Sequence, residues 1–400
     1  MDSNLRELFD LLIRWVHLIA GIMWIGNSML WNWLDRNLLP REGAPEGFEG
    51  EIWLVHSGGF YQMEKKQLAP NQMPAVLHWF KWQAYTTWMS GFALLLLVYY
   101  MGDASFLVDP AVAKISHGEA MAIGLGSLAG GFLIYDVIWR SPLRAREPVA
   151  IALCLMLLLA IIYGLNHLLS GRAAFIHVGT LLGSIMVGNV FFHIIPSQRE
   201  LIALTKSGKR QGAKLGKHAK QRSIHNNYMT FPVLFVMLSN HFPSAYGNSL
   251  NWLILIVLMV AGALVRHFMN IRFWWRPWLP AATVTVIVAV GIAFALVSRT
   301  SAPAAMAATD PRDKVDFTAV RIIMRQRCSP CHSAKPTDDQ WKQAPNNVMF
   351  DTPEQIKMFS ERIKSRVVIS KTMPFGNKTG MTQDERDVLA RWFLQGSSIQ

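Results

Sequence analysis

The chain has 400 residues, of which 52% are hydrophobic and only 16% are charged, against about 25% charged residues in an average soluble domain. The deficit falls in residues 8–298, which contain long apolar runs, so the composition excludes an ordinary soluble protein over most of the length. The net charge of +13 lies mostly between the apolar runs and argues against a nucleic-acid partner, and three cysteines, two of them in one CxxCH motif, exclude a disulfide framework.

The apolar runs predict a polytopic bundle of membrane helices, because a spanning helix needs about 20 mostly apolar residues. The first run follows acidic and polar residues, lacks the basic start of a signal peptide, and is expected to remain as a membrane anchor. The sixth run is the shortest and contains Pro232. The eight predicted spans are residues 8–34, 78–101, 118–139, 148–168, 173–195, 227–241, 250–270 and 278–297.

Basic residues between the runs predict the orientation of the chain. Seventeen of them follow the first, third, fifth and seventh runs, whereas Arg6, Lys114 and Arg172 lie on the other side before the last run ends. Because positively charged loops stay in the cytoplasm, both termini are expected outside it. We therefore expect a multi-pass protein of the bacterial inner membrane with a periplasmic C-terminal region. Without the sixth run the chain would have seven spans, and the C-terminal region would lie in the cytoplasm. Because the basic residues place both termini outside the cytoplasm, we keep the sixth run as a span.

Two connecting segments are distinctive. The segment between the first two spans has about 43 residues, and a connection of that length is often functional. Residues 299–312 are rich in Pro, Ala and Ser and are predicted to be a linker. The predicted domains are therefore a membrane domain at 1–298 and a small domain at 313–400.

Seven histidines lie in or beside the predicted spans, where ionisable groups tend to be functional. Paired histidines on facing helices can hold b-type haem, and His17 and His177 are the candidate ligands of an intramembrane haem b. Each histidine could instead hydrogen-bond a backbone carbonyl or a neighbouring side chain. The seven are His17, His78, His167, His177, His193, His241 and His267.

The C-terminal domain contains Cys328-Ser329-Pro330-Cys331-His332, the attachment motif of c-type haem. Two thiols at this spacing can reach the porphyrin vinyl groups, and the adjacent histidine then lies beneath the iron. The alternatives are a redox CxxC or half of a zinc site. A zinc site needs further Cys or His ligands, and His332 is the last histidine in the chain.

Met373 is the candidate for the sixth ligand of the haem iron, since methionine opposite histidine is usual in electron-transfer cytochromes. It precedes Pro374 in a loop, which can present a thioether more easily than a helix can; Met349, Met358 and Met381 are the competitors. Thr382 to Glu385 form a capping box that starts a final helix over 383–394. Apolar residues at helical spacing before the CxxCH and in the final helix predict a small all-α domain similar to class I cytochrome c.

The membrane domain resembles the urate oxidase N-terminal family. The most specific match is the stretch from Trp79 to Trp88 followed by Ser90-Gly91. Two further stretches agree with it, and the eight-span plan with a c-haem tail extends the likeness over nearly the whole chain. These stretches are Trp15-Val16-His17 with Gly21, Trp24 and Gly26, and Val55-His56-Ser57-Gly58-Gly59-Phe60-Tyr61 with Lys65 and Lys66.

The resemblance implies a membrane-bound oxidoreductase that hydroxylates urate to 5-hydroxyisourate. This reaction removes two electrons and adds water, and the covalent haem c would pass the electrons to a periplasmic cytochrome or a terminal oxidase. The alternative is a non-enzymatic electron carrier from quinol or haem b to a periplasmic cytochrome. A transporter with a redox sensor fits less well, because the spans contain no inverted repeat.

The resemblance also favours a substrate site in the long inner segment. Glycines there let backbone N–H groups approach a planar anion, lysines supply positive charge, and a histidine can accept the proton of an attacking water. The candidate catalytic residues are accordingly His56, Tyr61, Lys65 and Lys66. From the residues alone, an ordinary basic loop with a Gly-rich turn fits equally well.

Overall fold

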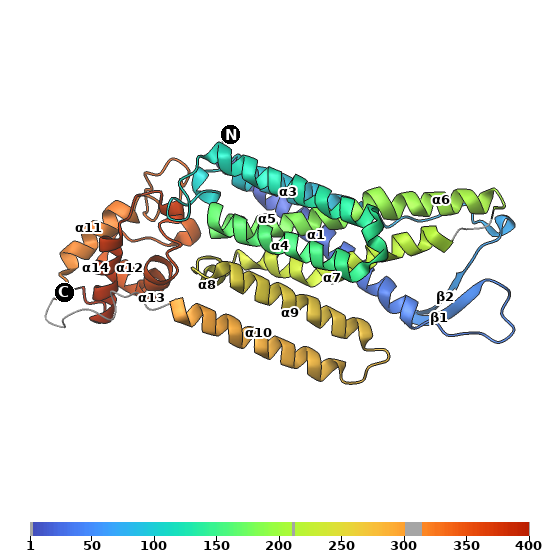
Figure 1. Cartoon of the computed structure of the whole chain (residues 1–400). Helices are drawn as coiled ribbons and strands as arrows, with labels where there is room; N and C mark the ends of the chain where they lie inside the picture. The colour runs from blue at the N-terminus through green and yellow to red at the C-terminus, as the bar shows by residue number, and fades with distance from the viewer. Residues whose placement is uncertain (1–2, 210–212, 301–313, 400) are drawn as a thin grey trace.

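The computed structural model describes residues 3–209, 213–300 and 314–399, and these are mostly helical (Figure 1). Six helices are long and apolar enough to cross a membrane, which indicates a multi-pass membrane protein. They are Leu5–Arg36, His117–Arg140, Glu147–Leu168, Gly171–Lys206, Asn251–Ile271 and Trp278–Ser298.

The predicted spans 78–101 and 227–241 are also helical over most of their length, but they are not among these six. The eight-span count therefore stays a prediction. In chain order the bundle contains α1 (Ser3–Arg36), α2 (Trp82–Leu94), η2 (Leu95–Tyr100), η3 (Ala104–Phe106), α3 (His117–Arg140), η4 (Pro142–Ala145), α4 (Glu147–Leu168), α5 (Gly171–Gly188), η5 (Asn189–Ile194), α6 (Ile195–Lys206), α7 (Ala213–Ser239), α8 (Pro243–Tyr246), α9 (Asn251–Ile271) and α10 (Trp278–Thr300).

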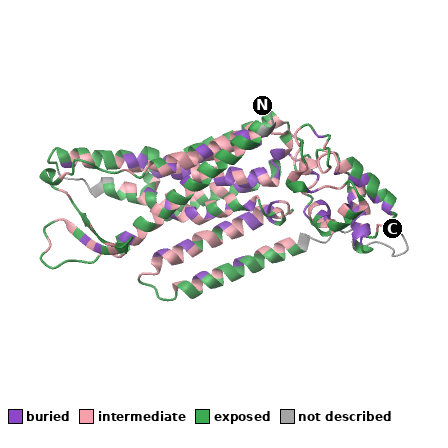
Figure 2. Ribbon diagram, turned by 180° about the vertical axis from the view of Figure 1, so that it is seen from behind, coloured by how far each residue is buried: buried purple, intermediate pink, exposed green. Residues whose placement is uncertain are grey.

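Helix α5 is the centre of the bundle. It contacts α2, α3, α4 and α7, and residues such as Phe175 and Val178 are fully buried. Helices α1 and α10 lie at the outside and expose large apolar side chains, including Ile22, Ile287 and Phe294 (Figure 2). Apolar exposure on this scale is expected where a helix faces lipid rather than water.

The long segment after α1 forms an antiparallel hairpin of β1 (Phe48–His56) and β2 (Gly59–Lys66), so the all-α prediction is wrong for this segment. Its two turn residues, Ser57 and Gly58, both have positive φ, as the right-handed twist of a two-residue hairpin requires. Figure 1 shows the hairpin beyond one end of the bundle and the C-terminal domain at the opposite end. These are called the hairpin end and the docking end.

The C-terminal domain has its own apolar core, which contains Cys328. The first and last helices pack together, with the Phe317 and Trp392 rings 6.0 Å apart. The predicted final helix is confirmed over its whole length, and so is its capping box. The predicted linker lies almost entirely outside the described residues. The helices are α11 (Phe317–Arg327), α12 (Pro353–Met358), α13 (Ser360–Ile363) and α14 (Gln383–Leu394), with shorter turns η7 (Pro345–Asn347), η8 (Lys364–Ile369) and η9 (Phe375–Asn377).

Candidate functional site

A buried ionic cluster lies toward the hairpin end of the bundle, centred on Asp136 of α3. One carboxylate oxygen of Asp136 is 2.6 Å from His193 Nε2 and 3.1 Å from an Arg222 guanidinium nitrogen, and the other is 2.7 Å from Arg140 Nε. Arg222, on α7, is fully buried. Charges at this depth are costly unless they are paired, so these four residues form one unit, the Asp136 cluster.

Polar residues continue the Asp136 cluster into the core. Arg222 donates to Asn189 Oδ1 at 3.3 Å and lies 5.2 Å from the centre of the Tyr135 ring. The Tyr135 hydroxyl is 2.8 Å from His225 Nδ1 and accepts from Asn189 Nδ2 at 2.9 Å. Because these bonds join α3, η5 and α7, the three helices are held in a fixed relative position here.

The π-helical segment η5 places His193 in the cluster. Pro196 follows this segment in α6 and has no N–H for a helical hydrogen bond. The chain widens at that point, and Ile195 N donates to Val190 O, five residues back. Such widened turns occur often at functional sites, and here the turn directs Asn189 and His193 into the same network.

A small cavity of about 330 Å³ opens beside His193. His193 Nδ1 is 3.3 Å from His218 Nε2, and both histidines line the cavity. Its charged lining residues are Arg140, Arg144 and Glu200, so cations outnumber anions. The volume is at the lower end of small-molecule sites, and the lining suits a small anion.

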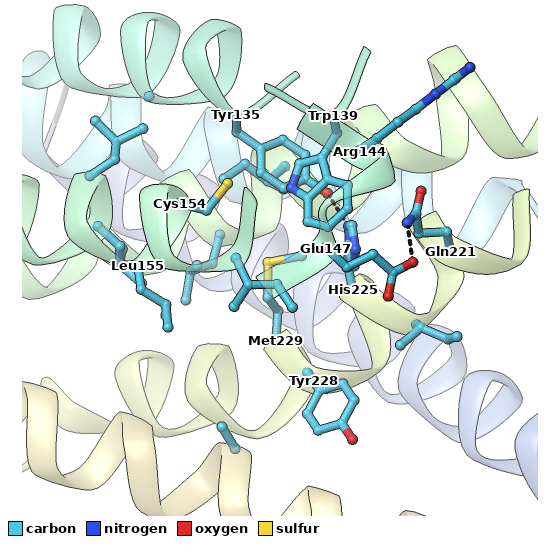
Figure 3. Close-up of a pocket in the computed structure, with 18 of the residues that line it drawn as sticks. Tyr135, Trp139, Arg144, Glu147, Cys154, Leu155, Gln221, His225, Tyr228 and Met229 are labelled. Carbon is cyan, nitrogen blue, oxygen red and sulfur yellow. Dashed lines mark hydrogen bonds between the residues drawn. The ribbon is translucent and has the colours of Figure 1, made fainter. Parts of the chain in front are cut away.

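A larger cavity of about 1230 Å³ lies between α3, α4, α5, α7 and α9 and shares Arg144 and His218 with the small one (Figure 3). Most of its wall is apolar, but His225 lies against Trp139, with ring centres 4.2 Å apart. Gln221, also on the wall, donates to Glu147 at 2.8 Å. The small cavity is therefore lined by charged residues and the larger one mostly by apolar residues, and the two meet at Arg144 and His218.

The candidate residues of the hairpin lie elsewhere. His56 and Tyr61 are exposed on β1 and β2, and none of the hairpin residues lines either cavity. Lys65 pairs with Asp35 and Glu49 at 3.0 and 3.2 Å. Burial lowers the pKa of Lys65, but the two carboxylates raise it by more, so the pKa lies above its usual value.

Lys66 pairs with Glu64 at 3.1 Å. Both hairpin lysines are thus engaged with carboxylates of the same region. The catalytic role predicted for the four hairpin residues remains a prediction.

The two candidate haem b ligands have separate partners. His17 Nδ1 is 2.9 Å from the Thr87 carbonyl and 3.2 Å from the Ser90 hydroxyl. His177 Nδ1 is 2.8 Å from the Ala173 carbonyl, and its Nε2 is 2.9 Å from the Tyr100 hydroxyl. These contacts match the alternative of locally bonded histidines, and the haem b site stays a prediction.

The residues of the CxxCH motif are arranged compatibly with covalent haem. Both cysteines are free thiols, and His332 Nδ1 is 2.9 Å from the Val348 carbonyl, which leaves Nε2 available to a metal. Met373 packs against the core that contains Cys328. Among the described residues, no group of three or more His, Cys, Asp or Glu side chains could hold a bare metal ion.

The two thiols share an unusual electrostatic environment. Burial raises the pKa of Cys328 and of Cys331 to about 12, and Asp338 adds to the effect at Cys331. Both are therefore protonated at neutral pH in the protein without haem.

The Asp136 cluster was missed by the sequence reasoning, although one signal for it was present. Asp136 lies within the predicted span 118–139, where an acidic residue is a functional candidate by default. Arg222 precedes the predicted span 227–241 and is counted with the basic inner loop, and His225 is not among the seven histidines named from the sequence. His193 was already singled out as an intramembrane histidine.

Together, the fold and the site define a multi-pass membrane protein with a buried ionic cluster beside a cationic cavity. The chain belongs to the urate oxidase N-terminal family, whose model matches residues 3–297. No curated protein and no solved structure matches it.

Proposed function

We propose that this protein oxidises urate to 5-hydroxyisourate in the cavity beside His193. The family supports a urate-related oxidoreductase. The observation that carries the proposal further is the cationic cavity of about 330 Å³ next to an Asp–His pair. Urate is a small planar anion, so Arg140 and Arg144 bind it through charge and hydrogen bonds.

The Asp136–His193 pair supplies the base. When His193 Nε2–H donates to Asp136, the proton is fixed on that nitrogen and Nδ1 is left as the acceptor. Nδ1 faces His218 at 3.3 Å, on the wall of the cavity. There it accepts a proton from the water that adds to the urate ring, while Asp136 stabilises the resulting imidazolium.

The overall reaction consumes one urate and one water and releases one 5-hydroxyisourate, two protons and two electrons. Cys328 and Cys331 would hold a haem c and His332 and Met373 would ligate its iron, and the haem would supply an acceptor that takes the electrons one at a time. A periplasmic cytochrome or a terminal oxidase then accepts them. With eight spans in the bacterial inner membrane, the hairpin end faces the cytoplasm and the C-terminal domain faces the periplasm.

Urate added to anaerobic membranes tests the proposal. We expect reduction of the c-haem spectrum and, in air, no stoichiometric hydrogen peroxide. If quinol reduces the haem and urate does not, the protein is an electron carrier and the proposed reaction is wrong.

Two variants locate the site. His193→Asn removes the base and should lower the rate of urate-dependent haem reduction about 10²–10⁴-fold, while His56→Ala should leave it near wild type. The opposite pattern would move the site to the hairpin.

A further inference from the structure

The docking end of the bundle meets the C-terminal domain through an ion pair that crosses between them. Lys378 Nζ is 2.9 Å from Asp103, just before η3, and also 2.9 Å from Asp338 and 2.5 Å from Asp339 of its own domain. Burial lowers the pKa of Lys378, but the three carboxylates outweigh this effect and raise it. Lys378 is therefore fully charged where the two domains touch.

Aromatic rings form the second part of the contact. Phe106 of the bundle and Phe375 of the C-terminal domain have ring centres 4.5 Å apart. The Arg172 guanidinium covers both rings at 5.5 and 5.7 Å, and Asn240 accepts a hydrogen bond from it at 3.3 Å. Only 8% of Phe106 is exposed, so this contact is part of a core.

Glycines allow the two surfaces to approach closely. A Cβ added to Gly376 would overlap Ser105 of the bundle, and one added to Gly247 would overlap Thr372 of the C-terminal domain. Glycine is thus required on each side of the contact, which is packed like a protein interior.

All of these contacts fall on the loop that carries Met373. Thr372, Phe375, Gly376 and Lys378 face the bundle, on both sides of Met373 in the sequence. Within its own domain the Met373 carbonyl accepts from Arg386 at 2.8 Å. The membrane domain therefore supports one side of the loop and the C-terminal domain supports the other.

We infer that the docking end positions the Met373 loop, with Asp103 and Phe106 as positioning residues for the sixth haem ligand. This inference rests on the proposed function, because it takes haem c to be bound at Cys328 and Cys331. It adds that residues of the membrane domain support the loop that would hold the haem iron.

Zero-length cross-linking tests the docking without using haem or urate. A carbodiimide joins a carboxylate and an amine that are in contact, forming an amide with loss of water. In the purified full-length protein, mass spectrometry should find an Asp103–Lys378 cross-link. Asp103→Asn should abolish it, and Asp339→Asn should preserve it. If Lys378 joins only to Asp338 or Asp339, the docking is wrong.

The haem readout tests the positioning. Methionine ligation gives ferric haem c a weak far-red absorption band and a high reduction potential. Asp103→Asn and Phe106→Ala should weaken that band and lower the potential. Asp339→Asn removes one charge from the same lysine but leaves the pair between the domains, so it should change neither.

Equal spectra and potentials in all three variants and the wild type would overturn the positioning role. A protein that shows the cross-link but contains no covalent haem would instead contradict the proposed function.

Discussion

Asp136 balances the buried Arg222 and His193 and the more exposed Arg140 at one end of an apolar bundle. Its carboxylate lies within 3.1 Å of Arg140, Arg222 and His193. A buried ion pair adds little net stability when it is intact, but losing one partner leaves the other charge buried and unpaired. The fully buried Arg222 therefore depends on Asp136.

We predict that Asp136→Asn destabilises the membrane domain by about 3–5 kcal/mol. The measurement is thermal unfolding of the detergent-solubilised protein. Asp35→Asn is the matched control, because Asp35 pairs with Lys65 at 3.0 Å at the hairpin end, where both side chains are about half exposed. That change should cost at most about 0.5 kcal/mol. Equal losses in the two variants would contradict the importance of the cluster.

Only part of the site can be predicted from single residues. The residues of the CxxCH motif are contiguous, so the motif can be recognised from the sequence alone. His193 lies 57 positions after Asp136 along the chain, and Arg222 lies 86 positions after it. Nothing local to Arg222 distinguishes it from the other basic residues of its loop, because its burial depends on how α3 and α7 pack.

Helix ends were predictable where charges interrupt apolar runs. The predicted span 118–139 corresponds to α3 at His117–Arg140, and 148–168 corresponds to α4 at Glu147–Leu168. The hairpin was missed because neither strand shows the alternation of a half-buried strand: β1 contains the continuous apolar run from Ile52 to Val55, and β2 is mostly exposed and ends in three charged residues. The continuation of α5 through η5 into α6 was missed because α6 is polar and extends past the apolar run.

We predict that replacing two glycines of α3 by alanine changes the stability of the protein in opposite directions. A Cβ on Gly124 would lie 2.5 Å from His177 Nε2 and 2.6 Å from the Tyr100 hydroxyl, so Gly124→Ala must disturb that hydrogen bond. We expect a loss of about 1–3 kcal/mol. Gly126 has nothing within 4 Å, and Gly126→Ala should gain about 0.5–1 kcal/mol.

Thermal unfolding of both variants checks this prediction. If Gly126→Ala loses as much stability as Gly124→Ala, the close packing of α3 against α5 at Gly124 is not the cause of the loss.

At the scale of the whole molecule, the docking contact should be insensitive to pH near neutrality. Hydrogen bonds from Ser105 and Lys378 outweigh burial and lower the pKa of Asp103 from 3.8, so its contribution is lost only as pH falls through that lowered value. The raised pKa of Lys378 means that its contribution is lost only as pH rises above 10.5.

Hydrogen exchange of the Ser105 and Phe106 amides, corrected for intrinsic rates, measures this dependence. Protection should be constant between about pH 5 and pH 9; it should fall only at more acidic pH, as Asp103 is protonated below 3.8, and at alkaline pH, as Lys378 loses its charge above 10.5. A midpoint near pH 6–7 would assign the contact to a histidine instead.

This docking could not be predicted from the sequence. Asp103 and Phe106 lie in a short connection whose composition is ordinary, and their partners are more than 260 positions away. The sequence predicts two units and a linker between them, but no local pattern shows that the two units pack together through contacts such as Phe106 against Phe375.

The Asp136 cluster and the haem-attachment cysteines lie at opposite ends of the bundle. Helix α3, with 24 residues, is about 36 Å long, so under the proposed function electrons released beside His193 would cross most of the bilayer. With the hairpin end in the cytoplasm, as proposed, they would move from the negative to the positive side, and each would contribute about 2.3 kcal/mol per 100 mV. Turnover should therefore be electrogenic and discharge the membrane potential. In proteoliposomes, a potassium gradient with valinomycin that makes the hairpin side negative should accelerate urate oxidation, and the reversed gradient should slow it.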